Sequence, residues 1–209
     1  MKINKILISL FTLSTLSYAH ARSYDYVTSI KVNQIELNTA VPADHVSQLI
    51  EVGNAKIEKV YSECTGNYEY SLHPTPHKTL KFEIFAEDNP HIQDEKFYQN
   101  KSSFTQLKQT RGRVWLNWNS TEDMKEKIVV NNIQITPQYT WQQFKQDFKQ
   151  SAQAHNPSNE AQVLILEPHQ INEFRKHPQD FSPPYTVFLN FSFNDGKLAQ
   201  FSIQQALAC

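Results

Sequence analysis

The histidines are the residues whose spacing first suggests chemistry. His73 and His77 stand four residues apart in the segment His-Pro-Thr-Pro-His, a spacing at which two imidazoles on a helix can bind one metal ion. The two intervening prolines forbid a helix, because proline lacks a backbone N–H and clashes with the preceding turn. A transition-metal site usually needs a third ligand, and only Glu69 or His91 lies near in sequence. We therefore expect a stiff, exposed loop and no bound metal.

Signatures of catalysis are missing from the sequence. It contains no G-x-S-x-G, H-E-x-x-H or C-x-x-C motif, and four glycines in 209 residues form no phosphate-binding loop. Glu167 precedes Pro168 at the expected end of a strand. It could cap the helix that follows, or act as a general acid beside a second carboxylate. Capping is better supported because the sequence supplies no partner, so we expect no catalytic residue and no cofactor.

Aromatic residues could instead form a surface that binds another protein. Trp115 and Trp118 lie three positions apart in an alternating segment, so they face opposite sides of a strand. One belongs to the core, and the other is exposed or covered by the connecting segment. Tyr68 and Tyr70 lie on another expected strand, and packing in the core is the alternative role for these aromatics. The candidate binding residues are Tyr68, Tyr70, His73, His77, Trp115 and Trp118.

The first 21 residues are typical of a secretory signal peptide. Two lysines precede an uncharged, mostly apolar run over residues 6–16, and Ala19-His20-Ala21 offers small residues before a cleavage at Arg22. Cleavage before His20 is the alternative. The apolar run is too short to span a bilayer, and no later run approaches the ~18 residues that a span needs. We expect an exported, periplasmic protein without a membrane span after cleavage.

The two cysteines fit this compartment. An even number of cysteines in an exported chain predicts disulfide pairing, here between Cys64 and Cys209. Such a bond would staple the C-terminal end to the first half of the chain. The alternatives are two free thiols or a bridge between molecules.

An internal repeat suggests the domain organisation. Residues 30–37 and 128–135 share the pattern I-x-V-N-x-I-x-[L/I], 98 positions apart, and each copy alternates like one half-buried strand. A helical pattern and three strands follow each copy. We therefore expect an α+β fold of two diverged β-α-β-β-β halves, residues 22–87 and 128–209, with mainly antiparallel sheets and helices packed on one face. Chance similarity is the alternative.

The connecting segment, residues 88–127, contains one expected strand, Arg113–Trp118, which we expect to pair with residues 128–135. A further helix is expected within the insertion 168–184. In the second half, Thr140 and Gln143 form a capping-box pattern. The helix after it should bury one apolar stripe, consisting of Trp141, Phe144, Phe148 and Ala152.

The last hairpin turns near Asn194-Asp195-Gly196. A two-residue loop would place Phe191 opposite Gln200. A three-residue loop would place Phe191 opposite Ala199 and keep apolar residues on one face. We expect the second register for that reason.

Composition limits the function. A formal net charge of −1 argues against nucleic-acid binding, which needs a basic face. Duplicated β-α-β-β-β units resemble, at the level of the fold, secreted inhibitors of the cystatin and β-lactamase-inhibitor kinds and small exported immunity proteins. This resemblance implies a protein-binding module that occludes an envelope or toxin partner. The alternative is a cell-envelope hydrolase that uses Glu and His residues on loops. The oligomeric state does not follow from the sequence.

Overall fold

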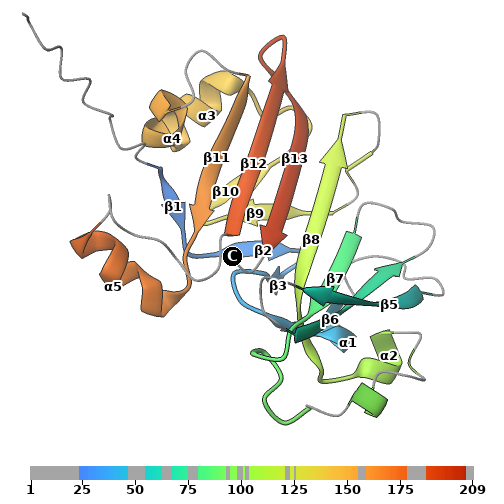
Figure 1. Ribbon diagram of the computed structural model, residues 1–209. Coiled ribbons are helices and arrows are strands. Elements are labelled where there is room, and N and C mark those ends of the chain that lie inside the picture. The colour runs from blue at the N-terminus through green and yellow to red at the C-terminus, as the bar shows by residue number, and fades with distance from the viewer. Residues whose placement is uncertain are drawn as a thin grey trace, which may run out of the picture.

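A computed structural model describes most of the chain, and Figure 1 shows the arrangement of its elements. The described residues are 24–46, 55–62, 67–74, 80–92, 95–97, 101, 104–120, 123–124, 126–154, 159–177 and 187–205. The expected signal peptide lies outside them, as do His77, Cys64 and Cys209.

A nine-stranded sheet dominates the molecule. Its strands are β1 (Tyr26–Val27), β4 (Val41–Pro42), β5 (Ala55–Ser62), β6 (Asn67–Pro74), β7 (Leu80–Ile84), β8 (Arg111–Asn119), β11 (Glu160–Ile165), β12 (Val187–Asn194) and β13 (Lys197–Gln205). The order is β1-β11-β12-β13-β8-β7-β6-β5, with β4 also paired to β8. The sheet is mixed, because β1 is parallel to β11 while the other pairs are antiparallel.

A smaller sheet and short helices complete the described fold. The small sheet has the order β10-β9-β2-β3. Its strands are β2 (Ile30–Val32), β3 (Ile35–Glu36), β9 (Ile128–Val130) and β10 (Ile133–Ile135). The helices are α1 (Ala43–Val46), α2 (Phe104–Leu107), α3 (Trp141–Asp147), α4 (Lys149–Ala154), α5 (Pro168–Lys176) and the 3-10 helix η1 (Glu95–Phe97).

The expected α+β fold of two β-α-β-β-β halves is wrong. The described residues form thirteen strands in two sheets, one of them large and mixed, against six short helical segments. Each segment expected as one lead strand turns back on itself at an asparagine. Asn33 and Asn131 have φ of 47° and 51°, a left-handed conformation that asparagine tolerates better than most residues. The expected staple between Cys64 and Cys209 is unsupported, because both cysteines lie outside the described residues.

The two hairpins that contain these asparagines pair with one another. β2 is antiparallel to β9, with Ile30 opposite Val130 and Val32 opposite Ile128. The strand at residues 113–118 therefore does not pair with residues 128–135, as the sequence led us to expect. It belongs to β8, whose neighbours are β13 and β7.

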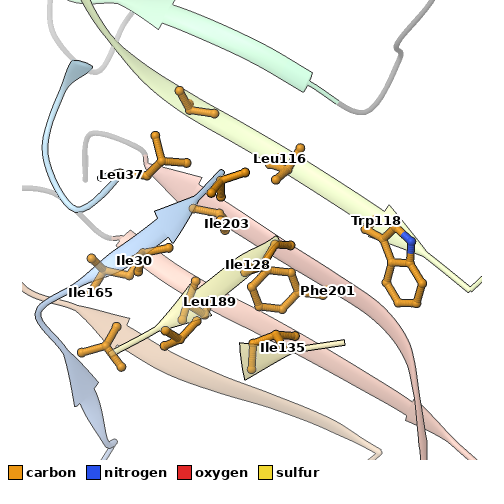
Figure 2. Close-up of a cluster of buried hydrophobic side chains, with 14 of the residues drawn as sticks. Ile30, Leu37, Leu116, Trp118, Ile128, Ile135, Ile165, Leu189, Phe201 and Ile203 are labelled. Carbon is orange, nitrogen blue, oxygen red and sulfur yellow. The ribbon is translucent and has the colours of Figure 1, made fainter. Parts of the chain in front are cut away.

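The main core lies between the small sheet and one face of the large sheet. Figure 2 shows side chains of both sheets meeting there, with Ile30 and Ile128 from the small sheet facing Leu189 and Ile203 from the large one. These four side chains are at most 1% exposed. Alternate residues of a strand point to opposite faces of the sheet. The side chains between these core residues therefore lie on the other face of the large sheet, away from the main core.

The α3–α4 segment extends this core and confirms the capping-box prediction. The Gln143 N–H donates to Thr140 Oγ1, and the Thr140 N–H donates to Gln143 Oε1. The ring of Phe144 lies 4.9 Å from that of Phe191, and the expected apolar stripe is buried except for the half-buried Trp141. The expected single helix is interrupted at Phe148, which separates α3 from α4.

The final hairpin uses neither of the two registers considered from the sequence. The turn is the two-residue loop Asp195-Gly196, with φ of 50° and 75°, and Phe193 faces Leu198. A bulge then skips Ala199, so that Phe191 faces Phe201. The expectation that apolar residues share one face is correct, but a bulge achieves it instead of a longer loop.

Candidate functional site

A groove of about 630 Å³ crosses the face of the large sheet opposite the main core. It lies over β11, β12, β13 and β8, which run side by side in Figure 1. The lining residues are Asn117, Trp118, Asn119, Glu160, Ala161, Gln162, Asn190, Phe191, Ser192, Gln200, Phe201, Ser202 and Gln204. Among them, Ala161, Phe191, Phe201 and Trp118 bury their side chains on the core face, so they contribute backbone to the groove floor.

Two rows of polar side chains cover this floor. Strand register places the members of each row directly opposite one another. The first row consists of Gln162, Asn190, Ser202 and Asn117. The second row consists of Glu160, Ser192, Gln200 and Asn119. Seven of these eight residues carry a neutral amide or hydroxyl, so the groove presents hydrogen-bonding groups with little charge.

A hydrogen-bonded chain organises the first row. Gln162 Nε2 donates to Asn190 Oδ1 at 2.8 Å, and Asn190 Nδ2 donates to Ser202 Oγ at 3.1 Å. Asn190 is held from both sides, which restricts its rotamer. Among the described residues, Gln162 Oε1 and the Ser202 hydroxyl proton have no partner. The chain is therefore preorganised and still has an acceptor at one end and a donor at the other.

An aromatic border lies beside the first row. The next row of the same face consists of Leu164, Phe188, Gln204 and Trp115. Phe188 and Trp115 are half-buried, and the Trp115 Nε1–H donates to the Gln205 carbonyl at 3.1 Å. Lys81 Nζ lies 5.1 Å from the centre of the Trp115 ring. The border thus offers two partly accessible aromatic rings next to the neutral rows.

The aromatic residues singled out from the sequence do not form one surface patch. Tyr70 and Trp118 are buried, at 8% and 6% exposure, so neither presents a side chain to a partner. Trp115 faces the opposite side of β8 from Trp118, as predicted, and forms part of the aromatic border. For Tyr68 and His73 the structure describes only the backbone, within β6.

A charged cluster lies on β8 beyond the groove. The Arg113 side chain is 4% exposed and binds both oxygens of Asp88, at 2.8 and 2.9 Å. Its Nη1 also lies 3.4 Å from Glu167 Oε1. Because the guanidinium is buried, these two carboxylates neutralise a charge that would otherwise be costly to bury. The cluster therefore ties the loop after β7 and the start of α5 to the sheet.

Glu167 has the structural role that the sequence favoured. It is the N-cap residue of α5, and its N–H donates to Gln170 Oε1 at 2.9 Å. His169 Nδ1 lies 3.7 Å from the second oxygen of Glu167, but its side chain is 67% exposed. A carboxylate committed to Arg113 beside an exposed imidazole is a poor general acid or base. Within the described ranges, no three His, Cys, Asp or Glu side chains come together as a metal site.

Sequence reasoning missed the groove because its residues look like an ordinary solvated strand face. The available signal was the run of amides and hydroxyls at alternate positions, such as Asn190 and Ser192 on β12 and Gln200 and Ser202 on β13. Most solvated strand faces contain charged residues, but Glu160 is the one ionisable residue among those that line the groove. Only the sheet order shows that four such strands adjoin.

Comparison with protein-family models, curated proteins and solved structures gave no significant match. The class of protein is therefore defined by its own fold and site. It is a mostly β protein with a mixed nine-stranded sheet and a neutral polar groove on the open face of that sheet. None of the helices in the described part of the chain is long and apolar enough to cross a membrane.

Proposed function

We propose that this chain is an exported binding protein, not an enzyme, and that its ligand lies in the polar groove over β11, β12, β13 and β8. The observation that carries the proposal is the pair of amide and hydroxyl rows over a hollow of about 630 Å³. Such a volume falls within the range of small-ligand pockets. Export rests on the signal-peptide pattern of residues 1–21.

The groove has the properties of a binding surface. Three side chains of its first row, Gln162, Asn190 and Ser202, are held by hydrogen bonds to one another, so these three lose little freedom when a ligand binds. Its floor is formed by four adjoining strands of the large sheet. Glu160 is the one ionisable residue among the lining residues, and a single exposed carboxylate supplies no acid–base pair.

The experiment compares two double variants of matched chemistry. Asn117→Ala/Gln200→Ala removes two exposed amides from the groove. Asn132→Ala/Gln134→Ala removes two exposed amides from the β9–β10 hairpin, which belongs to the other sheet. Purified protein is mixed with envelopes of the source cell, and the fraction that co-sediments is measured.

We expect the wild-type protein and the hairpin variant to co-sediment equally, and the groove variant to stay largely in solution. Equal retention of all three proteins would show that the ligand lies elsewhere. Failure of the wild-type protein to co-sediment, or turnover of an envelope component by it, would overturn the proposal of a binding protein.

A protein partner bound at the edge of the sheet is the second candidate. It keeps the idea of an inhibitor or immunity protein, and the observation that favours it is on β5. This eight-residue strand ends the order of the large sheet, and its Tyr61 is 55% exposed, the one large exposed hydrophobic side chain among the described residues. Edge strands accept a strand from a partner through backbone hydrogen bonds. In the same assay this candidate predicts that Tyr61→Ala lowers retention and the groove variant does not.

A further inference from the structure

We infer that the ligand of the groove is a neutral oligosaccharide, an inference that rests on the function proposed above. The argument comes from the chemistry of the two polar rows, the border beside them and the width of the face. Each of these features restricts the class of ligand in a different way.

The charge of the groove argues against anionic ligands. No Lys, Arg or His is among the lining residues, so the groove offers no counter-charge to a phosphate, a uronate or a nucleic acid. The single carboxylate, Glu160, is exposed at one end of the second row. A ligand without charge loses the least solvation free energy on entering such a site.

The polar groups match a chain of hydroxyls. A side-chain amide offers a donor and an acceptor side by side, and a sugar ring presents adjacent hydroxyls that each donate and accept. Asn117 and Gln200 are exposed, and among the described residues neither makes a side-chain hydrogen bond. Gln162 Oε1 and the Ser202 hydroxyl add a further acceptor and donor in the same row. A neutral polyhydroxylated ligand could satisfy all four residues directly or through water.

A protein partner fits this face less well. The centre of a protein interface is typically apolar, with buried aromatic or arginine anchors. Here the centre is made of amides and hydroxyls, and the aromatic rings of Phe188 and Trp115 stand only at its border. An aromatic ring beside hydrogen-bonding groups suits the apolar face of a sugar ring.

The size of the face fits a short chain. Strands in a sheet lie about 4.8 Å apart, so the three spacings from β11 to β8 make a strip roughly 14 Å wide. Asn117 and Gln200 are exposed on the two strands at the β8 side of the strip. A chain of several sugar rings could therefore lie across the four strands. Its end could extend out of the groove at the β8 side, past Asn117 and Gln200.

The test is an NMR titration of the purified protein with defined oligosaccharides. The neutral probes are hexasaccharides of β-1,4-linked glucose, α-1,4-linked glucose and β-1,4-linked N-acetylglucosamine. A galacturonate hexasaccharide of similar size is the anionic comparison, and a twelve-residue peptide of Gly, Ser and Asn is the peptide comparison. The readout is the set of side-chain NH₂ signals of Gln162, Asn190 and Asn117.

We expect at least one neutral hexasaccharide to shift these signals, and the galacturonate and the peptide to leave them unchanged. The groove variant Asn117→Ala/Gln200→Ala should bind that hexasaccharide about tenfold more weakly, since two hydrogen bonds are lost. The affinity of the hairpin variant Asn132→Ala/Gln134→Ala for that hexasaccharide should be within about twofold of the wild-type affinity. If the double variant unfolds, Gln200→Ala alone serves, with a smaller loss expected.

The two proposals fail in different ways. If envelope retention depends on the groove but no neutral hexasaccharide binds, the ligand class is wrong and the binding function stands. If the peptide or the galacturonate alone shifts the signals, the ligand class is likewise wrong. If the groove variant matches the wild type both in envelope retention and in affinity for the hexasaccharides, both proposals are wrong.

Discussion

Asn33 and Asn131 make equivalent hydrogen bonds to each other's hairpin. The Asn33 N–H donates to the Lys127 carbonyl at 3.0 Å, and its Oδ1 accepts from the Lys127 N–H at 2.8 Å. The Asn131 N–H donates to the Ser29 carbonyl at 2.6 Å, and its Oδ1 accepts from the Ser29 N–H at 3.3 Å. The two copies of the repeated pattern thus hold one another reciprocally, and both asparagines have a positive φ.

We expect Asn131→Ala to lower the free energy of unfolding by about 2 kcal/mol. The substitution removes the acceptor for the Thr28 and Ser29 N–H groups and places alanine in a left-handed conformation. Asn131→Gly should cost about half as much, because glycine tolerates the positive φ. Urea unfolding measures both values. Asn132→Ala, an exposed neighbour in the same turn, is the control, and equal effects at positions 131 and 132 would contradict the reciprocal arrangement.

Removal of the buried guanidinium should be among the most harmful single changes. We expect Arg113→Leu to cost about 3–5 kcal/mol, because it leaves the carboxylates of Asp88 and Glu167 partly buried without their cation. Lys176→Leu, which removes one member of an exposed ion pair with Glu173, should cost about 0.5 kcal/mol or less.

The loss of stability in Arg113→Leu could come from uncompensated charge or from lost packing, and two further variants separate these causes. Adding Asp88→Asn to Arg113→Leu should recover part of the lost stability, because it removes one of the uncompensated charges. A triple variant that also carries Glu167→Gln should recover more. If both neutralised variants are less stable than Arg113→Leu alone, the ion cluster does not account for the effect.

Gly112 lies too close to β7 for any side chain. A Cβ at this position would stand 2.6 Å from Phe82 Cε1 and 2.7 Å from the Glu83 carbonyl oxygen. We expect Gly112→Ala to cost about 1–3 kcal/mol through overpacking. Gly196→Asn tests the contrasting case, because φ there is +75° with open space around it and asparagine tolerates this conformation. Its thermal unfolding midpoint should stay close to that of the wild type, and a comparable fall in both midpoints would argue against the close approach.

The stability of the protein should decline above about pH 10, the ordinary pKa of tyrosine. Burial raises the pKa of Tyr139, and the hydrogen bond from its hydroxyl to Asp147 Oδ2 at 2.7 Å and the charge of Asp147 raise it further. A raised folded-state pKa means that the folded state retains the proton more strongly than the unfolded chain does. The stabilisation is therefore complete below the unfolded pKa and is lost progressively as the pH rises above it.

Tyr139→Phe isolates this contribution. We expect it to cost about 1 kcal/mol at neutral pH through the lost hydrogen bond, and to flatten the decline above pH 10. Asp147→Asn should flatten the decline only in part, because the burial of Tyr139 remains. Unfolding in urea between pH 7 and 11 measures these slopes. An unchanged alkaline slope in Tyr139→Phe would show that another group controls it.

Several features of the chain could be predicted because they depend on neighbours in sequence. Thr140 and Gln143 cap α3 as the pattern indicated, and Trp115 and Trp118 face opposite sides of β8. The role of Glu167 at the start of α5 also follows from the residues beside it. Caps and strand alternation act over a few residues, so their signal is local.

Other features depend on which segments meet, and local patterns do not specify that. The repeated pattern around Asn33 and Asn131 was recognisable as a repeat, but each copy turns at its asparagine and pairs with the other copy. The bulge at Ala199 is a similar case, because it brings Phe191 opposite Phe201 where a shift of the loop would also have aligned apolar residues. Both outcomes are decided by the packing of distant strands.

The sequence alone thus determined the neutral amides and hydroxyls of the groove, their alternation along each strand and the cap that begins α3. Only the tertiary structure decided that β11, β12, β13 and β8 adjoin, so that Gln162, Asn190, Ser202 and Asn117 form one row. The physical reason is that burial of the opposite face against the small sheet fixes the register in which these strands pair, and pairing between distant segments carries no local signal in the sequence. The polar side chains therefore come together on the open face, although long stretches of chain separate β8 from β11 and β11 from β12.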